Sequence, residues 1–296
     1  MQQNDFLDQD FLQKLEQISL LSRKVFHGLL KGERRSKKKG VSIEFADYRD
    51  YVPGDDLRFL DWNIYGRLER LFIKLFQEEE DLNVFFLVDS SESMNFGTPS
   101  KWIYAKKLVA ALSYVALMGL DRISVAAFAG NVHDHLPLMR GKHAVWRLFE
   151  FLRNLDIHSQ EPTNLEQACR TFAMQSKSSG MIILLSDFMD PGGYEEGLKF
   201  FASRNHDVLA IQILSPEEIQ PTLVGDIRLV DCETASTVDL SISAHLLTRY
   251  DHILHGYLQQ LKDWCVRHDI FYLFTSTEQS FEDLVLKYLR NLGMVH

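Results

Sequence analysis

From residue 82 onward, short apolar runs alternate with segments of helical length, and this alternation constrains the fold more than any other feature. The runs 82-LNVFFLVDS-90, 123-ISVAAFA-129, 181-MIILLSD-187, 207-DVLAIQIL-214 and 269-DIFYLFT-275 have the composition of buried strands. We expect helices at 100–119, 142–154, 164–176, 193–204, 244–267 and 279–291, and an edge strand at 132–138. The order of strands and helices predicts an α/β fold with a doubly wound, mostly parallel sheet flanked by helices.

Two segments lie outside this alternation. Residues 1–81 contain an amphipathic helix at 6–30 that we expect to pack on the body, a basic loop at 31–40, and strand candidates at 42–52 and 71–77. A second segment, at about 216–243, contains a predicted hairpin at 226–242. Both sets of strands need a partner for their apolar faces, so we expect them to form one small β-subdomain. The predicted domains are therefore 1–81 and 82–296, with the hairpin inserted in the second.

Composition narrows the functional class. The formal net charge is −9, without the basic field that a nucleic-acid-binding protein usually has. Acidic residues precede the first apolar ones, unlike the basic start of a signal peptide, and the longest apolar stretch, 108–120, is too short to span a bilayer. The three cysteines have no metal-type or redox-type spacing, which fits a reducing compartment; they are Cys169, Cys232 and Cys265. We expect a cytoplasmic protein without a transmembrane segment.

Oxygen-bearing side chains follow two of the predicted strands. Asp89, Ser91 and Ser93 come at the end of the first, Asp187 ends the strand 181–187, and Thr163 directly precedes a helix. Ligands of open parallel sheets bind beyond the carboxyl ends of the strands, so these five residues can converge on one edge. Magnesium and calcium prefer such oxygen ligands. The pattern predicts a divalent-cation site with two formal negative charges, open to a carboxylate from outside.

Other interpretations of the same residues stay open. Asp89 could be the nucleophile of a metal-dependent hydrolase or phosphatase, but such enzymes want a second aspartate two positions later, where this chain has Ser91. A serine hydrolase would need a G-x-S-x-G elbow, and a P-loop would need G-x-x-x-x-G-K-[ST]; the sequence has neither. Ser91, Ser93 or Thr163 could simply cap helices, and Asp187 could be a turn residue. The site could then be empty and the protein a scaffold.

The five residues resemble the metal-ion-dependent adhesion site of von Willebrand factor type A domains. Asp89, Ser91 and Ser93 match its first motif, Thr163 its threonine, and Asp187 its second aspartate. The resemblance extends over roughly residues 82–292 by element order. It implies a bound divalent cation, with magnesium expected and manganese or calcium as alternatives. It also implies that an Asp or Glu of a partner completes the ligand shell.

A longer motif lies upstream. The stretch 44-EFADYRDYVPGDDLRFLDW-62, with Gly66-Arg67 and 71-LFIKLF-76, is similar to the signature of the bacterial domain-of-unknown-function family fifty-eight. That family carries a type A domain after this segment and is commonly encoded beside MoxR-type AAA+ ATPases. The resemblance implies a partner of this class, or the client that the pair remodels. Many relatives begin with two membrane spans, which we do not expect here, and Gly66 replaces a usual alanine.

The signature contains several charged residues, which we expect to form a structural network joining the N-terminal strands to the type A body. They are Asp55, Asp56, Arg58, Asp61 and Arg67, beside Trp62. The whole sequence thus predicts a non-enzymatic, metal-dependent protein-interaction module that acts as an adaptor or co-chaperone of a MoxR-type ATPase.

Overall fold

The computed structural model describes residues 7, 10–17, 44–77, 82–158, 163–176, 178–204, 206–233 and 236–285. The chain divides into two compact units. Unit 1 contains Met1–Phe26 and Leu82–His296, and unit 2 contains His27–Asp81. The basic loop predicted at 31–40 lies outside the described residues.

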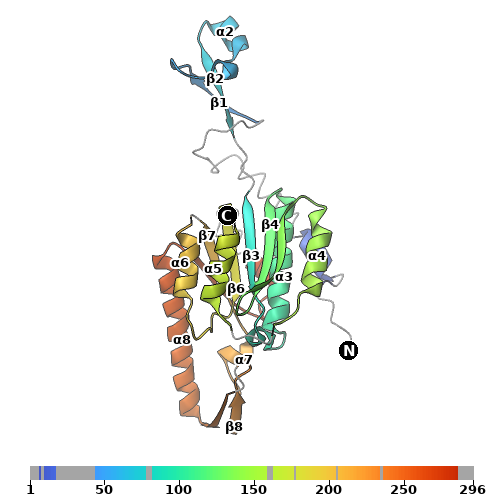
Figure 1. Ribbon diagram of the computed structural model, residues 1–296, viewed down its shortest axis with the longest axis vertical. Helices are drawn as coiled ribbons and strands as arrows, with labels where there is room; N and C mark the ends of the chain where they lie inside the picture. Colours follow the sequence, from blue (N-terminus) through green and yellow to red (C-terminus); the bar gives the residue numbers. More distant parts are fainter. Residues whose placement is uncertain are drawn as a thin grey trace. The chain divides into compact units, whose positions relative to one another are not determined.

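Unit 1 is built on a six-stranded, mostly parallel sheet (Figure 1). Its strand order is β10-β7-β6-β3-β4-β5, and only β5 runs antiparallel, at the edge beside β4. The strands are β3 (Asn83–Asp89), β4 (Arg122–Phe128), β5 (Val132–Arg140), β6 (Met181–Ser186), β7 (Asp207–Leu214) and β10 (Phe271–Ser276). The chain leaves β3 toward β4, then returns to place β6 on the other side of β3. Such a switch point is where open α/β sheets bind ligands.

Both faces of this sheet are covered by helices, which explains why its strands are apolar on consecutive residues. In β3, Val84, Phe86 and Val88 belong to one core cluster, while Phe85 and Leu87 belong to the other. Successive side chains of a strand point to opposite faces, so a strand buried on both sides needs no polar alternation. The mixed α/β fold with a helix-flanked, mostly parallel sheet is confirmed.

The helices divide between the two faces. The first core cluster contains residues of α3 (Lys101–Met118) and α4 (Ala144–Asn154). The second contains residues of α5 (Leu165–Gln175), α6 (Glu195–Ala202) and α8 (Ala244–Arg267). Most side chains of α3 are buried, and the helix packs against the central strands β3 and β4. A short helix, α7 (Pro216–Ile219), follows β7 and was not predicted.

The N-terminal helix packs on unit 1, as predicted. Residues 10–17 are helical, and Phe11 and Leu15 are buried in the first core cluster. The Phe11 ring lies 4.9 Å from the ring of Phe281, centroid to centroid. Residues 281–285 are helical too; the remainder of the predicted helices 6–30 and 279–291 lies outside the described residues.

The predicted hairpin exists, but the predicted shared β-subdomain is wrong. Strands β8 (Gly225–Val230) and β9 (Thr237–Ile242) form one two-stranded sheet in unit 1, while β1 (Glu44–Asp50) and β2 (Phe72–Gln77) form another in unit 2. The prediction assumed that the apolar face of the hairpin must be buried within the chain. No residue of β8 or β9 is buried, so backbone pairing holds the hairpin without that cover.

Unit 2 also contains a 3-10 turn, η1 (Leu57–Phe59), and a helix, α2 (Trp62–Leu68), where only strands and a turn were expected. Asp61 begins α2 by accepting hydrogen bonds from the backbone N–H groups of Asn63 and Ile64. This is ordinary N-cap chemistry, and it gives the signature aspartate a structural role.

The signature charges pair inside unit 2. The closest ion pairs are Arg49–Asp55 at 2.9 Å, Arg58–Asp56 at 2.6 Å and Lys74–Asp61 at 3.1 Å. Asp61 also accepts a hydrogen bond from the Tyr48 hydroxyl, at 3.1 Å. Two of these pairs join parts of unit 2, Arg49 of β1 to Asp55 of the turn and Lys74 of β2 to Asp61 at the start of α2. The link that we expect between this network and the sheet body stays a prediction. Within the described ranges, no helix is long and apolar enough to cross a membrane.

Candidate functional site

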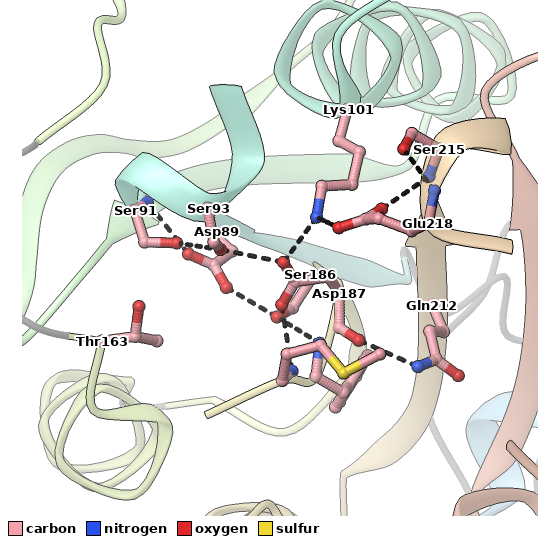
Figure 2. A network of polar contacts seen from close by, with 12 residues as sticks. Asp89, Ser91, Ser93, Lys101, Thr163, Ser186, Asp187, Gln212, Ser215 and Glu218 are labelled. Atoms are coloured by element: carbon pink, nitrogen blue, oxygen red, sulfur yellow. Dashed lines mark hydrogen bonds and ion pairs between the residues drawn. The ribbon is translucent and has the colours of Figure 1, made fainter. Parts of the chain in front are cut away.

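The predicted site residues lie at the switch point of the sheet. Asp89 is the last residue of β3, and Ser91 and Ser93 follow in the loop that forms a second 3-10 turn, η2 (Glu92–Asn95). Asp187 follows β6 directly, and Thr163 stands two residues before α5. Because β3 and β6 are parallel neighbours, their carboxyl ends meet at one edge. Figure 2 shows all five side chains around this edge.

Asp89 is fully buried and held by two donors. The backbone N–H of Ser91 donates to Oδ1 at 3.0 Å, and the Ser186 hydroxyl donates to Oδ2 at 2.6 Å. Burial, followed by the negative charge of Asp187, raises the pKa of the Asp89 carboxyl to about 7. The ionised form of this acid is therefore under-compensated, and a cation beside it would be strongly stabilising.

The hydroxyl groups join Asp89's loop to Asp187. The Ser91 and Ser93 Oγ atoms lie 3.0 Å apart, and Ser93 donates to Asp187 Oδ2 at 2.8 Å. Neighbouring ligands of an octahedral magnesium ion, at bonds of about 2.1 Å, are separated by about 3 Å. The spacing of these oxygen atoms therefore fits part of a divalent-cation shell. The described residues contain no group of three or more His, Cys, Asp or Glu side chains placed to hold a metal, so hydroxyl ligands would be essential here.

A buried lysine, which the sequence analysis missed, also reaches the site. Lys101 Nζ donates to Asp187 Oδ2 at 2.7 Å and to Glu218 Oε1 at 2.6 Å, and its side chain is 0% exposed (Figure 2). Burial opposes its charge, but Asp187 and Glu218 outweigh that effect and raise the Lys101 pKa. The Asp187 carboxylate is thus already paired with an ammonium, whereas Asp89 has only dipolar donors.

Neighbouring residues hold Asp187 and Glu218, the two acidic partners of Lys101, in position. Glu218 closes a capping box at the start of α7 by accepting from the Ser215 backbone N–H at 2.7 Å. Gln212, buried in β7, donates to the backbone carbonyl of Asp187 at 2.9 Å. With Asp89, Asp187 and Glu218 ionised, three carboxylates face one ammonium. Two negative charges then lack an ionic partner inside this group, which favours binding of a cation.

Thr163 faces the cluster from the α5 side but is bound to a different residue. Figure 2 shows it opposite Ser91 and Asp89. Its Oγ1 donates to Glu233 Oε1 at 2.7 Å, and its backbone N–H donates to Glu233 Oε2 at 3.0 Å. The other four predicted residues form a continuous chain of hydrogen bonds, in the order Asp89, Ser91, Ser93 and Asp187. Thr163, the fifth predicted residue, is instead hydrogen-bonded to Glu233, which the sequence analysis did not identify.

The sequence analysis missed three residues of the site, Lys101, Glu218 and Glu233, and the sequence contains a signal for only some of them. Lys101 is the first residue of a long apolar helix, where the positive end of the helix dipole disfavours a cation, so an acidic partner could have been suspected. Glu218 stands in a capping-box pattern, Ser215 to Glu218, that predicts the turn but not its contact with Lys101. Glu233 lies in a hairpin turn 70 residues from Thr163, and no local pattern connects them.

The chain is similar to mycobacterial proteins that are described as uncharacterized. The chain is 27% identical over 252 residues to the uncharacterized protein Rv1480 of Mycobacterium tuberculosis, covering 83% of this chain and 78% of that protein. It is 30% identical over 115 residues to the uncharacterized protein MAV169 of Mycobacterium avium, covering 38% and 66% respectively. Among solved structures, the conserved hypothetical protein BatB from Bacteroides thetaiotaomicron matches with a TM-score of 0.47 and 16% identity, over 72% of this chain and 100% of BatB.

A family model matches residues 47–259, a range that includes most of the signature of unit 2 and all five predicted site residues. The match covers most of the chain. The chain belongs to the family described as protein of unknown function DUF58.

Proposed function

We propose that this protein is a metal-dependent protein-interaction module of the von Willebrand factor type A kind, without catalytic activity of its own. Asp89, Ser91 and Ser93 would hold a divalent cation, with Thr163 contributing directly or through water and Asp187 through water. Magnesium is the expected ion, and manganese or calcium could use the same oxygen ligands. The cation would attract a carboxylate from a partner. The observation that carries the proposal is the gathering of oxygen atoms at about 3 Å spacing beside two buried aspartates.

The geometry around Asp89 supports a binding role over the alternative of a metal-dependent hydrolase or phosphatase. Both carboxylate oxygens of Asp89 accept hydrogen bonds, and the side chain is 0% exposed, so neither oxygen is presented for attack on a substrate. Ser91 stands where an aspartyl phosphatase wants its acid, and a hydroxyl cannot serve as that acid at neutral pH. Asp89 is instead placed to carry negative charge beside a cation.

The proposed partner is a MoxR-type AAA+ ATPase or the client on which it acts. The support for this step is membership of the DUF58 family together with the signature of unit 2. An exposed Asp or Glu of that partner would supply the final ligand. The chain would then act as an adaptor or co-chaperone, and unit 2 is available as a second contact region.

A second candidate is a scaffold in which no metal is needed. The observation that favours it is Lys101, whose buried ammonium already neutralises Asp187. In that case the lysine replaces the cation permanently, and Asp89 stays protonated for part of the time at neutral pH. The protein would still bind partners, but neither chelator nor magnesium would change their affinity.

Titration calorimetry and affinity capture separate the two candidates. Wild type, Asp89→Asn and the control Glu217→Gln, which alters an exposed carboxylate on α7, are titrated with magnesium and then used to capture a MoxR-type ATPase with magnesium or chelator. We expect saturable magnesium binding and magnesium-dependent capture by wild type and Glu217→Gln, and neither by Asp89→Asn. If the ATPase is captured equally well with chelator, and equally well by Asp89→Asn, the protein is a scaffold that needs no metal. Turnover of a generic phosphate ester, abolished by Asp89→Asn, would show that the protein is an enzyme.

A further inference from the structure

Thr163 is already bound to a carboxylate of the same chain. Both oxygens of Glu233 are used, one by the Thr163 hydroxyl at 2.7 Å and the other by its backbone N–H at 3.0 Å. Two parallel donors that match the two oxygens of one carboxylate make a specific subsite, as in other bidentate pairs. The N-terminus of α5, an 11-residue helix, begins two residues later and favours negative charge at this place.

The hairpin delivers Glu233 to this subsite. Glu233 lies in the turn between β8 and β9, where the Asp231 backbone N–H donates to the Ser236 carbonyl at 2.8 Å. The Glu233 N–H donates to Asp231 Oδ1 at 3.0 Å, which fixes the residue that points at Thr163. In the described part of the turn, these bonds hold the Glu233 backbone while its carboxylate meets Thr163. Figure 1 shows β8 at the same end of unit 1 as α7, the helix that follows the site.

The strands of the hairpin are bound weakly to the rest of unit 1. None of their residues is buried, and Val230 and Val238 are 62% and 54% exposed. Segments with few buried apolar contacts open at low free-energy cost. A hairpin of this kind can leave the subsite without disturbing the sheet.

We propose that Glu233 is an internal ligand that occupies the carboxylate position of the site until an acidic segment of a partner displaces it. This inference rests on the proposed function, because Thr163, which holds Glu233, is one of the ligands proposed for the cation. An internal ligand lowers the apparent affinity for an external one by the fraction of time that the subsite is open. It thereby selects for partners whose other contacts help to hold the hairpin away.

The test uses acetate as the smallest carboxylate and the Thr163 amide as the reporter. Full-length, isotope-labelled wild type, Glu233→Ala and the control Glu217→Ala are titrated with acetate while the nitrogen–hydrogen signal of Thr163 is followed, each with magnesium and with chelator. A charge-assisted pair of hydrogen bonds predicts that Glu233→Ala binds acetate at least about tenfold more tightly than wild type. Glu217→Ala should match wild type. The variant Glu233→Gln, which keeps the side-chain shape, should fall between them.

The outcomes distinguish this inference from the proposed function. Equal acetate affinity in wild type and Glu233→Ala would overturn the internal ligand, even where magnesium strengthens acetate binding and so supports the metal site. Tighter binding in Glu233→Ala that is the same with magnesium and with chelator would establish the internal ligand and overturn the metal bridge. Tighter binding that also requires magnesium would support both.

Discussion

At the scale of single residues, the two buried aspartates of the site are compensated in different ways. Asp187 is paired with the ammonium of Lys101 and accepts from Ser93. Asp89 accepts from a backbone N–H and from serine hydroxyl groups, which are dipoles without a full positive charge. An ion pair in a buried position is strongly coupled to its partner, because removing one charge leaves the other without compensation. Lys101 and Asp89 are therefore the positions where single substitutions report most on the electrostatics of the site.

Replacement of Lys101 by methionine should destabilise the protein by about 3–5 kcal/mol in chelator, because Asp187 and Glu218 then lose their buried counter-charge. Magnesium should restore part of this loss if the site holds a cation. Urea unfolding with chelator and with magnesium measures both effects. Lys107→Met, on the same helix but with a partly exposed side chain, is the control and should cost little. An unchanged midpoint for Lys101→Met would contradict the importance of the ion pair.

The stability of the metal-free protein should depend on pH through Asp89. Burial and the charge of Asp187 raise the pKa of Asp89 in the folded state to about 7, well above the usual value for an aspartate, so the folded chain keeps a proton that the unfolded chain releases. Stability is then lost as pH rises from about 4 to 7 and is level above that. Asp89→Asn lacks this loss. We expect its stability relative to wild type to rise by about 2–3 kcal/mol between pH 5 and pH 8.

Urea unfolding in chelator at the two pH values provides this comparison. Magnesium at pH 8 should stabilise wild type more than Asp89→Asn, because it binds the ionised aspartate of wild type and cannot bind the amide in the same way. A constant difference between the two proteins from pH 5 to pH 8 would show that Asp89 is ionised throughout that range.

At the scale of elements, the loop after β3 is shaped by one glycine. Gly97 has φ +96°, and a Cβ at this position would lie 2.5 Å from the Cβ of Ser215. The close approach brings the Ser91–Ser93 loop against the start of α7, where Glu218 meets Lys101. A side chain here would separate two of the elements that build the site.

We therefore expect Gly97→Ala to lower the free energy of unfolding by about 2–4 kcal/mol, through the strained φ and the clash with Ser215. Gly256→Ala is the matched control, because Gly256 lies within α8 and has no heavy atom within 4 Å of the added Cβ. It should stabilise the protein by about 0.5–1 kcal/mol. Chemical denaturation should show a lower free energy of unfolding for Gly97→Ala and a higher one for Gly256→Ala, each relative to wild type. Equal effects would mean that the loop can relax away from Ser215.

Sequence predicted elements better than contacts, for physical reasons visible at particular residues. The strands of the sheet and helices such as α8 (Ala244–Arg267) follow from apolar periodicity, and the strand ends place Asp89 and Asp187. Helix α2 was missed because it is short and contains Gly66, which weakens a helical pattern. Pairing of Lys101 with Asp187 and of Thr163 with Glu233 depends on how loops 70 or more residues apart meet, and local sequence does not encode that.

At the scale of the whole molecule, the two units differ in what a cation could stabilise. The proposed ligands lie entirely in unit 1, whereas the charged signature pairs within unit 2. A ligand that binds only the folded state stabilises it by RT ln(1 + [L]/Kd), about 1.4 kcal/mol for each tenfold increase in concentration above Kd. That stabilisation should appear in the unit that contains the site.

Hydrogen exchange read by mass spectrometry, with magnesium and with chelator, tests this expectation. Magnesium should slow exchange in peptides that contain the loops after β3 and β6, because bound ligands suppress local opening at their site. Peptides from β1 and β2 should exchange at the same rate in both conditions, which makes unit 2 an internal control. Asp89→Asn should abolish the difference between magnesium and chelator. Protection that rises equally in both units, or in the variant as much as in wild type, would place the effect of magnesium away from Asp89 and remove the metal site from the proposed function.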